Sequence, residues 1–390
     1  MFLSFPDHIE AASRLIAVGF LALLVAFSLA VKSEARSAIT LEFDANVLVS
    51  DNPFLTTEKE RATGAVELVA RPRAELNLDP RTNLDFTGEV GVRQYSRRYG
   101  NFVTGRSDLQ VRHRRNEHLT VTGRAIYARD LISDSLTDSI DFAVDTRSIR
   151  ESVDARTSVA WSPNAITTIV GDGGWRRLRY PGSTLLDTTK AFDFGIAASR
   201  RLDEKLTVGV QAHRTMSNVL GGEDTSVTSL NATAVRRFSA YWYGGTQLGI
   251  EWSKLYAPVS LARESRARFN GAAHLCYEPA QTTACIRTAI GSEVSGLGGL
   301  QREFSVGADI RHRMSEFGTV SAEADYRRAR LPGYDAAARV FASSIRYEHR
   351  VRRNVYLTPS LAYLQRNRRA GEKADAFIFQ IGLSIRGARP

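Results

Sequence analysis

Histidine and cysteine are the residue types from which this sequence could build a nucleophile, a general base or a metal site. Seven histidines occur, and only His213 falls away from both the apolar N-terminal stretch and the predicted tight turns. No serine or aspartate motif adjoins His213 to make it a general base. The sequence also has no HExxH motif, no glycine-rich phosphate loop and no close Cys/His ligand set. We therefore expect neither an enzyme nor a metal or other cofactor.

The two cysteines are Cys276 and Cys285, separated by YEPAQTTA. In an exported chain they could pair across this short turn, because oxidising compartments favour disulfides. Two unlinked buried thiols are an equal alternative. The sequence leaves both open.

Arginine supplies most of the positive charge and alternates with carboxylates along one polar face. Guanidinium groups bind carboxylates and stack on rings, so this face could form a path for anionic or hydroxylated solutes. The alternative is that opposite charges pair and hold the shape of the protein. The candidate residues are Arg71, Arg73, Arg93, Arg124, Arg156, Arg287, Arg327, Glu89, Glu323 and Asp325.

The net charge of +10 is dispersed through the chain. A nucleic-acid-binding protein would gather such charge on one face or helix. We therefore expect no nucleic-acid partner.

The elements that must position this polar face are strands, because apolar and polar residues alternate from residue 38 to the end. Eighteen such segments run from 38–48 to 374–386, and most have about 10 to 15 residues. Strands in soluble sandwiches average about 5 to 6 residues, whereas tilted strands that cross a bilayer need this greater length. Pro72 lies inside the segment 64–79 and cannot donate to a ladder, so we expect a bulge or a split there.

The connections fall into two alternating classes. Short turns such as DPRT and RRNEH alternate with longer loops such as SDNPFLTTEKERAT. Outer-membrane barrels have short periplasmic turns and long extracellular loops. The pattern predicts an all-β, antiparallel up-and-down transmembrane barrel of about 18 strands, with 16 also plausible. Residues 49–63 and 130–147 would lie outside the cell and RRNEH in the periplasm.

The N-terminus carries an uncharged apolar run, LIAVGFLALLVAFSLAV at residues 15–31, after Arg14. This is typical of a secretory signal peptide, and an uncleaved membrane anchor is the alternative. We expect a signal peptide and short leader over residues 1–37 and the barrel over 38–390. The predicted location is the outer membrane of a Gram-negative bacterium, with its lipid as a partner.

Basic residues also gather at the predicted short turns. They could extend to the headgroups of the inner leaflet, or they could form a cationic periplasmic mouth that collects a polyanion. The residues of this candidate basic rim are Arg114, Arg115, Arg200, Arg201, Arg352 and Arg353.

The stretch LEFDANVLVSDNPFL at residues 41–55, with the pair Asp51 and Asn52, resembles the start of the putative beta-barrel porin 2 family. The likeness covers most of residues 38–386 and brings no catalytic residue. One departure is the ending RGARP after Ile385, where many outer-membrane barrels end on an aromatic residue.

The resemblance implies a conduit or accessory protein for export or surface assembly of exopolysaccharide. Its partners would then be an anionic polysaccharide and periplasmic export or assembly proteins. Two alternatives remain: a plugged, non-conducting barrel that anchors surface polymer or a periplasmic partner, and a general diffusion porin.

Overall fold

A computed structural model describes residues 37–57, 61–97, 99–135, 146–219, 224–256, 263–296, 299–330, 337–367 and 372–387. Eighteen strands and one short 3-10 helix account for nearly all of these residues. The elements are β1 (Ser37–Ser50), β2 (Thr63–Asp79), β3 (Thr82–Tyr95), β4 (Asn101–Arg114), β5 (Leu119–Leu131), η1 (Ile132–Ser135), β6 (Ile149–Asn164), β7 (Thr167–Arg179), β8 (Thr189–Arg201), β9 (Leu206–Val219), β10 (Thr225–Arg237), β11 (Trp242–Tyr256), β12 (Arg263–Tyr277), β13 (Thr282–Ser295), β14 (Gly299–Arg313), β15 (Gly318–Arg330), β16 (Ala337–Arg352), β17 (Val355–Asn367) and β18 (Lys373–Arg386).

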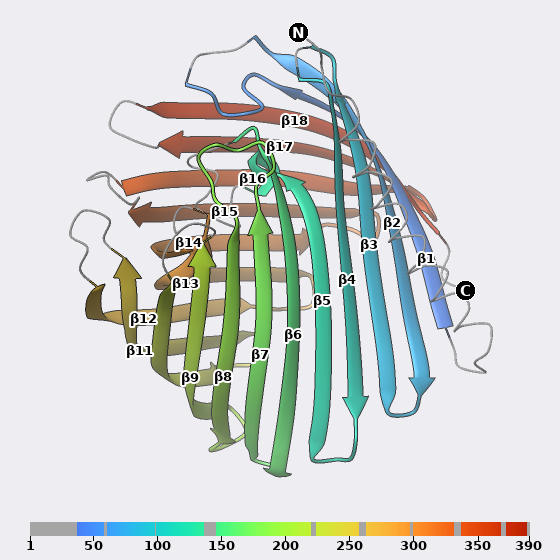
Figure 1. Cartoon of the computed structure of the whole chain (residues 1–390). Coiled ribbons are helices and arrows are strands. Elements are labelled where there is room, and N and C mark those ends of the chain that lie inside the picture. The colour runs from blue at the N-terminus through green and yellow to red at the C-terminus, as the bar shows by residue number, and fades with distance from the viewer. Residues whose placement is uncertain are drawn as a thin grey trace.

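The strands form one closed antiparallel sheet in which each strand pairs with its neighbours in sequence (Figure 1). Pairing of β1 with β18, from Glu42↔Arg386 to Ser50↔Ile378, closes the ring. The predicted up-and-down barrel of 18 strands is confirmed. In the described part of the chain, no helix has the length and apolar character needed to cross a membrane.

The outer surface of the barrel is mainly apolar. Every second residue of each strand points outward, and these alternate residues are mainly apolar. Large side chains there are half exposed, for example Phe43 at 51%, Leu68 at 58% and Ile196 at 58%. Leaving such side chains in water would forgo about 1.5–3 kcal/mol each relative to an apolar environment. A bilayer is the environment that this surface fits.

Aromatic side chains stand on this outer surface near the short turns. Trp161, Phe238, Tyr241, Trp242 and Phe317 are all exposed there. Aromatic rings concentrate at membrane–water interfaces, where an apolar body and a polar edge are both accommodated. These residues mark the boundary of the bilayer at the short-turn end.

The expected bulge or split at Pro72 is wrong. β2 continues through it, and Pro72 keeps its place opposite Leu41 of β1. Toward β3 the ladder omits Arg71 and Pro72 but keeps one register, from Ala70↔Val90 to Arg73↔Thr87. Proline removes one donor, and Gly88 makes room for its ring, since a Cβ on Gly88 would lie 2.9 Å from Pro72 Cγ. The register shift of this pair lies between Asn77 and Asp79 instead.

The expected long loops and the N-terminal segment are described only in part. Residues 1–36, which contain the expected signal peptide, lie outside the described residues, as do 58–60 and 136–145 of the two loops expected outside the cell. The turn RRNEH lies between β4 and β5 as expected. Which end faces the cell exterior stays a prediction.

Cys276 and Cys285 form a disulfide between β12 and β13, with their Cα atoms 4.2 Å apart. They are directly opposite each other in the ladder. The two cysteines are therefore bonded to each other, and the alternative of two unlinked thiols is wrong.

Labelling of single cysteines in intact cells tests the orientation of the barrel. Thr184 lies in the loop between β7 and β8, Glu117 lies in the turn between β4 and β5, and both are exposed. We expect a membrane-impermeant maleimide to label Thr184→Cys and to spare Glu117→Cys, because long loops face outward in such barrels. Both variants should react after lysis. Labelling of Glu117→Cys alone in intact cells would mean that the barrel is inverted.

Candidate functional site

The inner wall of the barrel carries the charged residues, because the positions that alternate with the apolar outer ones point into the lumen. Every candidate of the sequence analysis occupies such an inward position. Each of the seven candidate arginines has a carboxylate partner there. The arginine pairs are Arg71–Asp44, Arg73–Glu75, Arg93–Glu67, Arg124–Asp108, Arg156–Asp154, Arg287–Asp309 and Arg327–Glu303.

One cluster crosses the strands at the closure of the ring. Arg71 of β2 bonds Asp44 of β1 and places its Nε 2.7 Å from Glu89 Oε2 of β3. Arg386 of β18 lies 2.5 Å from Glu348 and 3.3 Å from Glu42. The first and last strands of the chain are thus joined by side chains as well as by their ladder.

A second cluster lies on β13 to β16. Arg287 is 2.6 Å from Asp309 and 3.3 Å from Asp325. Arg327 pairs with Glu303, and Glu323 accepts a hydrogen bond of 3.0 Å from the Ser344 hydroxyl. An exposed ion pair such as Arg287–Asp309 contributes about 0–1 kcal/mol, so its main effect is to fix positions rather than to supply stability.

Two recesses lie on the inner wall, one at each of these clusters. The first has a volume of about 370 Å³ and is lined by residues of β1 to β4 and β18. The second, of about 540 Å³, is lined by residues of β10 to β15, including Gln247, Arg287 and Arg327. Both are large enough for a small solute.

Arg106 of β4 is an inward arginine that the sequence analysis did not select. It is exposed, lies opposite Glu89 in the ladder and lines the first recess. No carboxylate within the described residues pairs with it. Its position could have been found from Leu109, which is exposed on the outer face three residues away and so sets Arg106 on the inner one.

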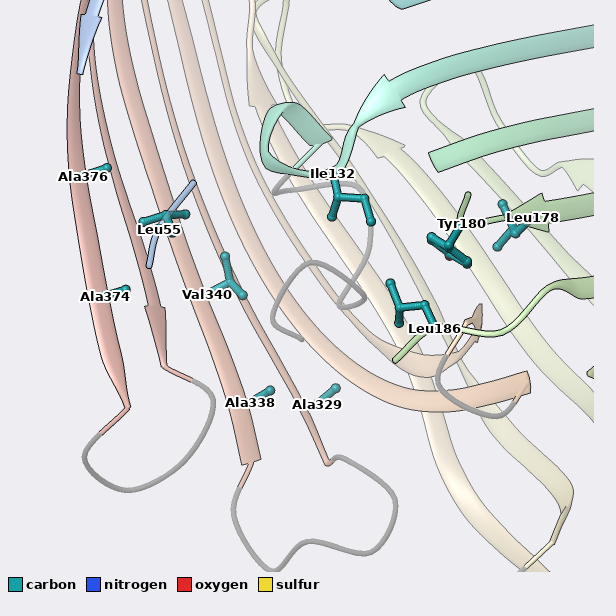
Figure 2. Packing of buried hydrophobic residues seen from close by; sticks show 10 residues of the cluster. All are labelled: Leu55, Ile132, Leu178, Tyr180, Leu186, Ala329, Ala338, Val340, Ala374 and Ala376. Carbon is teal, nitrogen blue, oxygen red and sulfur yellow. The ribbon is translucent and has the colours of Figure 1, made fainter. Parts of the chain in front are cut away.

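The long-loop end of the barrel is narrowed by loop residues that turn inward (Figure 2). Leu55, Ile132, Tyr180 and Leu186 come from three loops and pack in one buried cluster against the inner wall of β15 to β18. The wall positions under them are small: Ala329, Ala338, Ala374 and Ala376. These described loop segments therefore fold into the lumen rather than projecting from it. The sequence analysis did not predict this inward fold.

The pair Asp51 and Asn52 anchors the first of these loops. The Asn52 side chain donates to the carbonyls of Thr56 at 2.9 Å and Asp375 at 3.1 Å, and accepts from the Thr56 N–H at 2.9 Å. Asp51 accepts from the Phe377 N–H at 2.8 Å. The loop is held onto β18, and Leu55 keeps a left-handed backbone (φ 49°) with its side chain fully buried. The sequence analysis used this pair only as a mark of resemblance.

The six arginines of the candidate basic rim are all exposed at or beside short turns. They end β4, β8 and β16 or lie in the turns that follow. Within the described residues their guanidinium groups have no carboxylate partner. Their role, as a mouth or as lipid contacts, stays a prediction.

His213 lies 3.6 Å from Asp193, and Thr215 donates to Asp193 at 2.9 Å. The Thr215 hydroxyl also lies 3.3 Å from His213 Nε2, so these three side chains form one hydrogen-bonded group. No group of three or more His, Cys, Asp or Glu side chains within the described part of the chain could hold a metal ion.

Comparison with known proteins gives a likeness of fold. No protein-family model and no curated protein sequence matches the chain, so the resemblance to the porin 2 family stays a prediction. Among solved structures, Pseudomonas aeruginosa OpdQ is 10% identical, with 90% of this chain and 98% of that one covered and a TM-score of 0.47. Acinetobacter baumannii OccAB1 is 10% identical, with 92% and 99% covered and a TM-score of 0.47. For Pseudomonas aeruginosa OpdK with vanillate the values are 10%, 90%, 98% and 0.48. At these identities and TM-scores, the ligands of those proteins cannot be assigned to this chain.

Replacement of Asn52 by alanine tests the loop anchor. It removes the Asn52 side-chain hydrogen bonds to Thr56 and to the Asp375 carbonyl, and a hydrogen bond contributes about 0.5–1.5 kcal/mol. We expect faster protease cleavage within residues 51–57 of the folded barrel. Asn101→Ala, at the exposed start of β4, is the control and should leave cleavage unchanged. Equal cleavage of both variants would show that Asn52 does not hold the loop.

Proposed function

Because the chain is an outer-membrane β-barrel of a Gram-negative bacterium, we propose that it is a channel for small anionic solutes. The observation that carries this proposal is the first recess. Its lining includes four arginines (Arg71, Arg73, Arg106 and Arg386) and two glutamates (Glu42 and Glu89). Three of these arginines pair with carboxylates beside the recess (Asp44, Glu75 and Glu348), which leaves the guanidinium of Arg106 as the unpaired positive group of this lining.

Arg106 is the group in this recess that is free to bind a solute. Arg71, Arg73 and Arg386 already bond carboxylates of the wall. The planar guanidinium of Arg106 can take a carboxylate through two parallel hydrogen bonds. A binding group at the wall of a wide lumen favours passage of anions without closing the channel.

The size of the site favours small molecules over polymer. A recess of about 370 Å³ fits a ligand of metabolite size. The loop anchored by Asn52 also narrows the long-loop end, together with the other two loops of the buried cluster. Nothing in the described contacts favours polysaccharide export over diffusion of small solutes, so the diffusion alternative of the sequence analysis is the better supported one.

A plugged barrel is the second candidate function, and the buried loop cluster favours it. Leu55, Ile132 and Leu186 come from three different loops and meet inside the barrel. If this cluster closes the lumen to solutes, the barrel would act as an anchor with no passage. Conduction separates these two functions.

The basic rim would assist an anion channel at its short-turn end. Like charges around one opening add their fields and raise the local concentration of anions, an effect that salt weakens over about 8 Å at physiological ionic strength. In this role the rim would attract small anions rather than a polysaccharide. Contacts with lipid headgroups remain the alternative for these arginines.

Solute swelling of proteoliposomes tests the role of Arg106. An exposed guanidinium–carboxylate contact contributes about 1 kcal/mol, which corresponds to roughly a fivefold change in occupancy. We expect Arg106→Gln to lower the rate of gluconate entry relative to glucose by up to about fivefold.

Arg214→Gln is the matched control, since Arg214 is exposed on the outer face of β9, in the ladder opposite Phe194. It removes the same charge from the protein and should leave the ratio unchanged. An unchanged ratio in Arg106→Gln, or an equal fall in both variants, would contradict the assignment of Arg106.

A further inference from the structure

The ladder between β12 and β13 is incomplete. It runs from Tyr277↔Ala284 to Gly271↔Ile290 and then stops. Both strands continue beyond this point, since β12 remains paired with β11 as far as Tyr256↔Arg263 and β13 with β14 as far as Ser295↔Gly299. The wall of the barrel therefore has a gap on the long-loop side of these two strands.

Phe269 and Ser292 should be a hydrogen-bonded pair within this gap. If the register of Gly271↔Ile290 continued, Phe269 would face Ser292. The Cα separation of 4.2 Å between Cys276 and Cys285 is that of a non-hydrogen-bonded pair. Alternation along the ladder then makes Phe269 and Ser292 a pair that exchanges both backbone hydrogen bonds.

Side chains occupy these backbone groups instead. The Phe269 carbonyl accepts from Arg302 Nη2 at 2.5 Å. The Ser292 N–H donates to Glu251 Oε2 at 3.2 Å, and the Ser292 hydroxyl donates to Glu251 Oε1 at 2.9 Å. Asn270 also donates to Glu251, at 3.3 Å. Polar side chains thus replace the missing ladder, which an apolar environment requires.

Glu251 and Arg302 approach this gap from opposite faces of the wall. Glu251 lies between the outward side chains of Ile250 and Trp252, so it points inward, and it is fully buried. Arg302 shares the outward face of β14 with Phe304 and is 24% exposed. Arg302 Nη1 lies 2.5 Å from Glu251 Oε1. This ion pair, here called the clasp, passes through the barrel wall.

The disulfide joins β12 and β13 at the short-turn end of the same hairpin. Cys276 and Cys285 are bonded near the short turn, at the end of the hairpin away from the gap. The unpaired parts of β12 and β13, on the long-loop side of Gly271↔Ile290, can therefore separate further while the short-turn end of the hairpin stays joined. Glycines stand at the point of divergence, Gly271 on β12 and Gly291 on β13.

We propose that this gap is a lateral port, by which amphipathic carboxylic acids move between the lumen and the bilayer leaflet on the long-loop side. The carboxylate of such a molecule replaces Glu251 as the partner of Arg302. Its apolar tail lies against the exposed rings of Phe269 and Phe304. A neutral molecule with the same tail cannot make this exchange, so the port selects acids.

A fluorophore inside the barrel reports passage through the port. Gln247 faces the lumen on β11 and lines the second recess. Because the native cysteines are bonded to each other, Gln247→Cys provides one reactive thiol for labelling. The labelled barrel is placed in nanodiscs and titrated with 5-doxyl-stearic acid or with its methyl ester. We expect the acid to quench the fluorophore at lower concentration than the ester.

The two halves of the clasp should then act in opposite directions. Arg302→Gln removes the binding group, so quenching by the acid should fall to the level of the ester. Glu251→Gln removes the competing carboxylate and should lower the half-quenching concentration of the acid by about tenfold, equivalent to about 1.4 kcal/mol. Arg339→Gln, an exposed arginine on the outer face of β16, is the control and should change nothing.

Three results would overturn the port. Acid and ester could quench equally, Arg302→Gln could leave the acid titration unchanged, or both clasp variants could shift it in the same direction, as expected for a contact that is only structural. The comparison of acid with ester needs no substitution in the clasp, so it decides the proposal even if a clasp variant does not fold. It is also independent of whether the lumen prefers small anions.

Discussion

Pairing of the backbone is the constraint on which the rest of this structure depends. A bilayer offers no water to the N–H and C=O groups of a strand, so a sheet that crosses it must close on itself. The ladder between β1 and β18 provides that closure. Where the ladder stops between β12 and β13, the carboxylate of Glu251 and the guanidinium of Arg302 take the backbone groups that β-pairing would have used. The gap is thus an exception that the same constraint explains.

Closure also separates two environments and so decides where charge can reside. Outward positions are mainly apolar, with arginines such as Arg214, Arg302 and Arg339 among them, and the paired arginines and carboxylates such as Arg71 and Asp44 alternate with them on the inner wall. Most inner arginines are held by carboxylates from neighbouring strands, as with Arg71 between Asp44 and Glu89. Those ion pairs fix the side chains around Arg106, whose guanidinium faces the first recess. The paired residues therefore shape the recess, and the unpaired Arg106 is the group in it that can bind a solute.

Sequence reasoning reached the strands because their signal is local. Alternation and the two classes of connection gave the strand number, and the inward position of residues such as Arg287 and Glu323 follows from the same period. The prediction of a bulge or split at Pro72 was wrong, because the effect of a proline in a strand depends on the residue opposite it. Here that residue is Gly88, which leaves room for the proline ring. The inward fold of the loops, the anchor by Asn52 and the clasp were not predictable in this way. Glu251 and Arg302 lie 51 residues apart and meet only because a ladder is missing.

Conduction by the unmodified protein in a planar lipid bilayer tests the central claim most directly. With a gradient of potassium chloride across the membrane, the account predicts discrete current steps and a reversal potential of the sign that chloride permeation gives. Folded, inserted barrels that carry no current would contradict it and favour the plugged barrel. A reversal potential of the opposite sign would show that cations pass instead, and that the unpaired charge of Arg106 does not govern ion passage through the lumen.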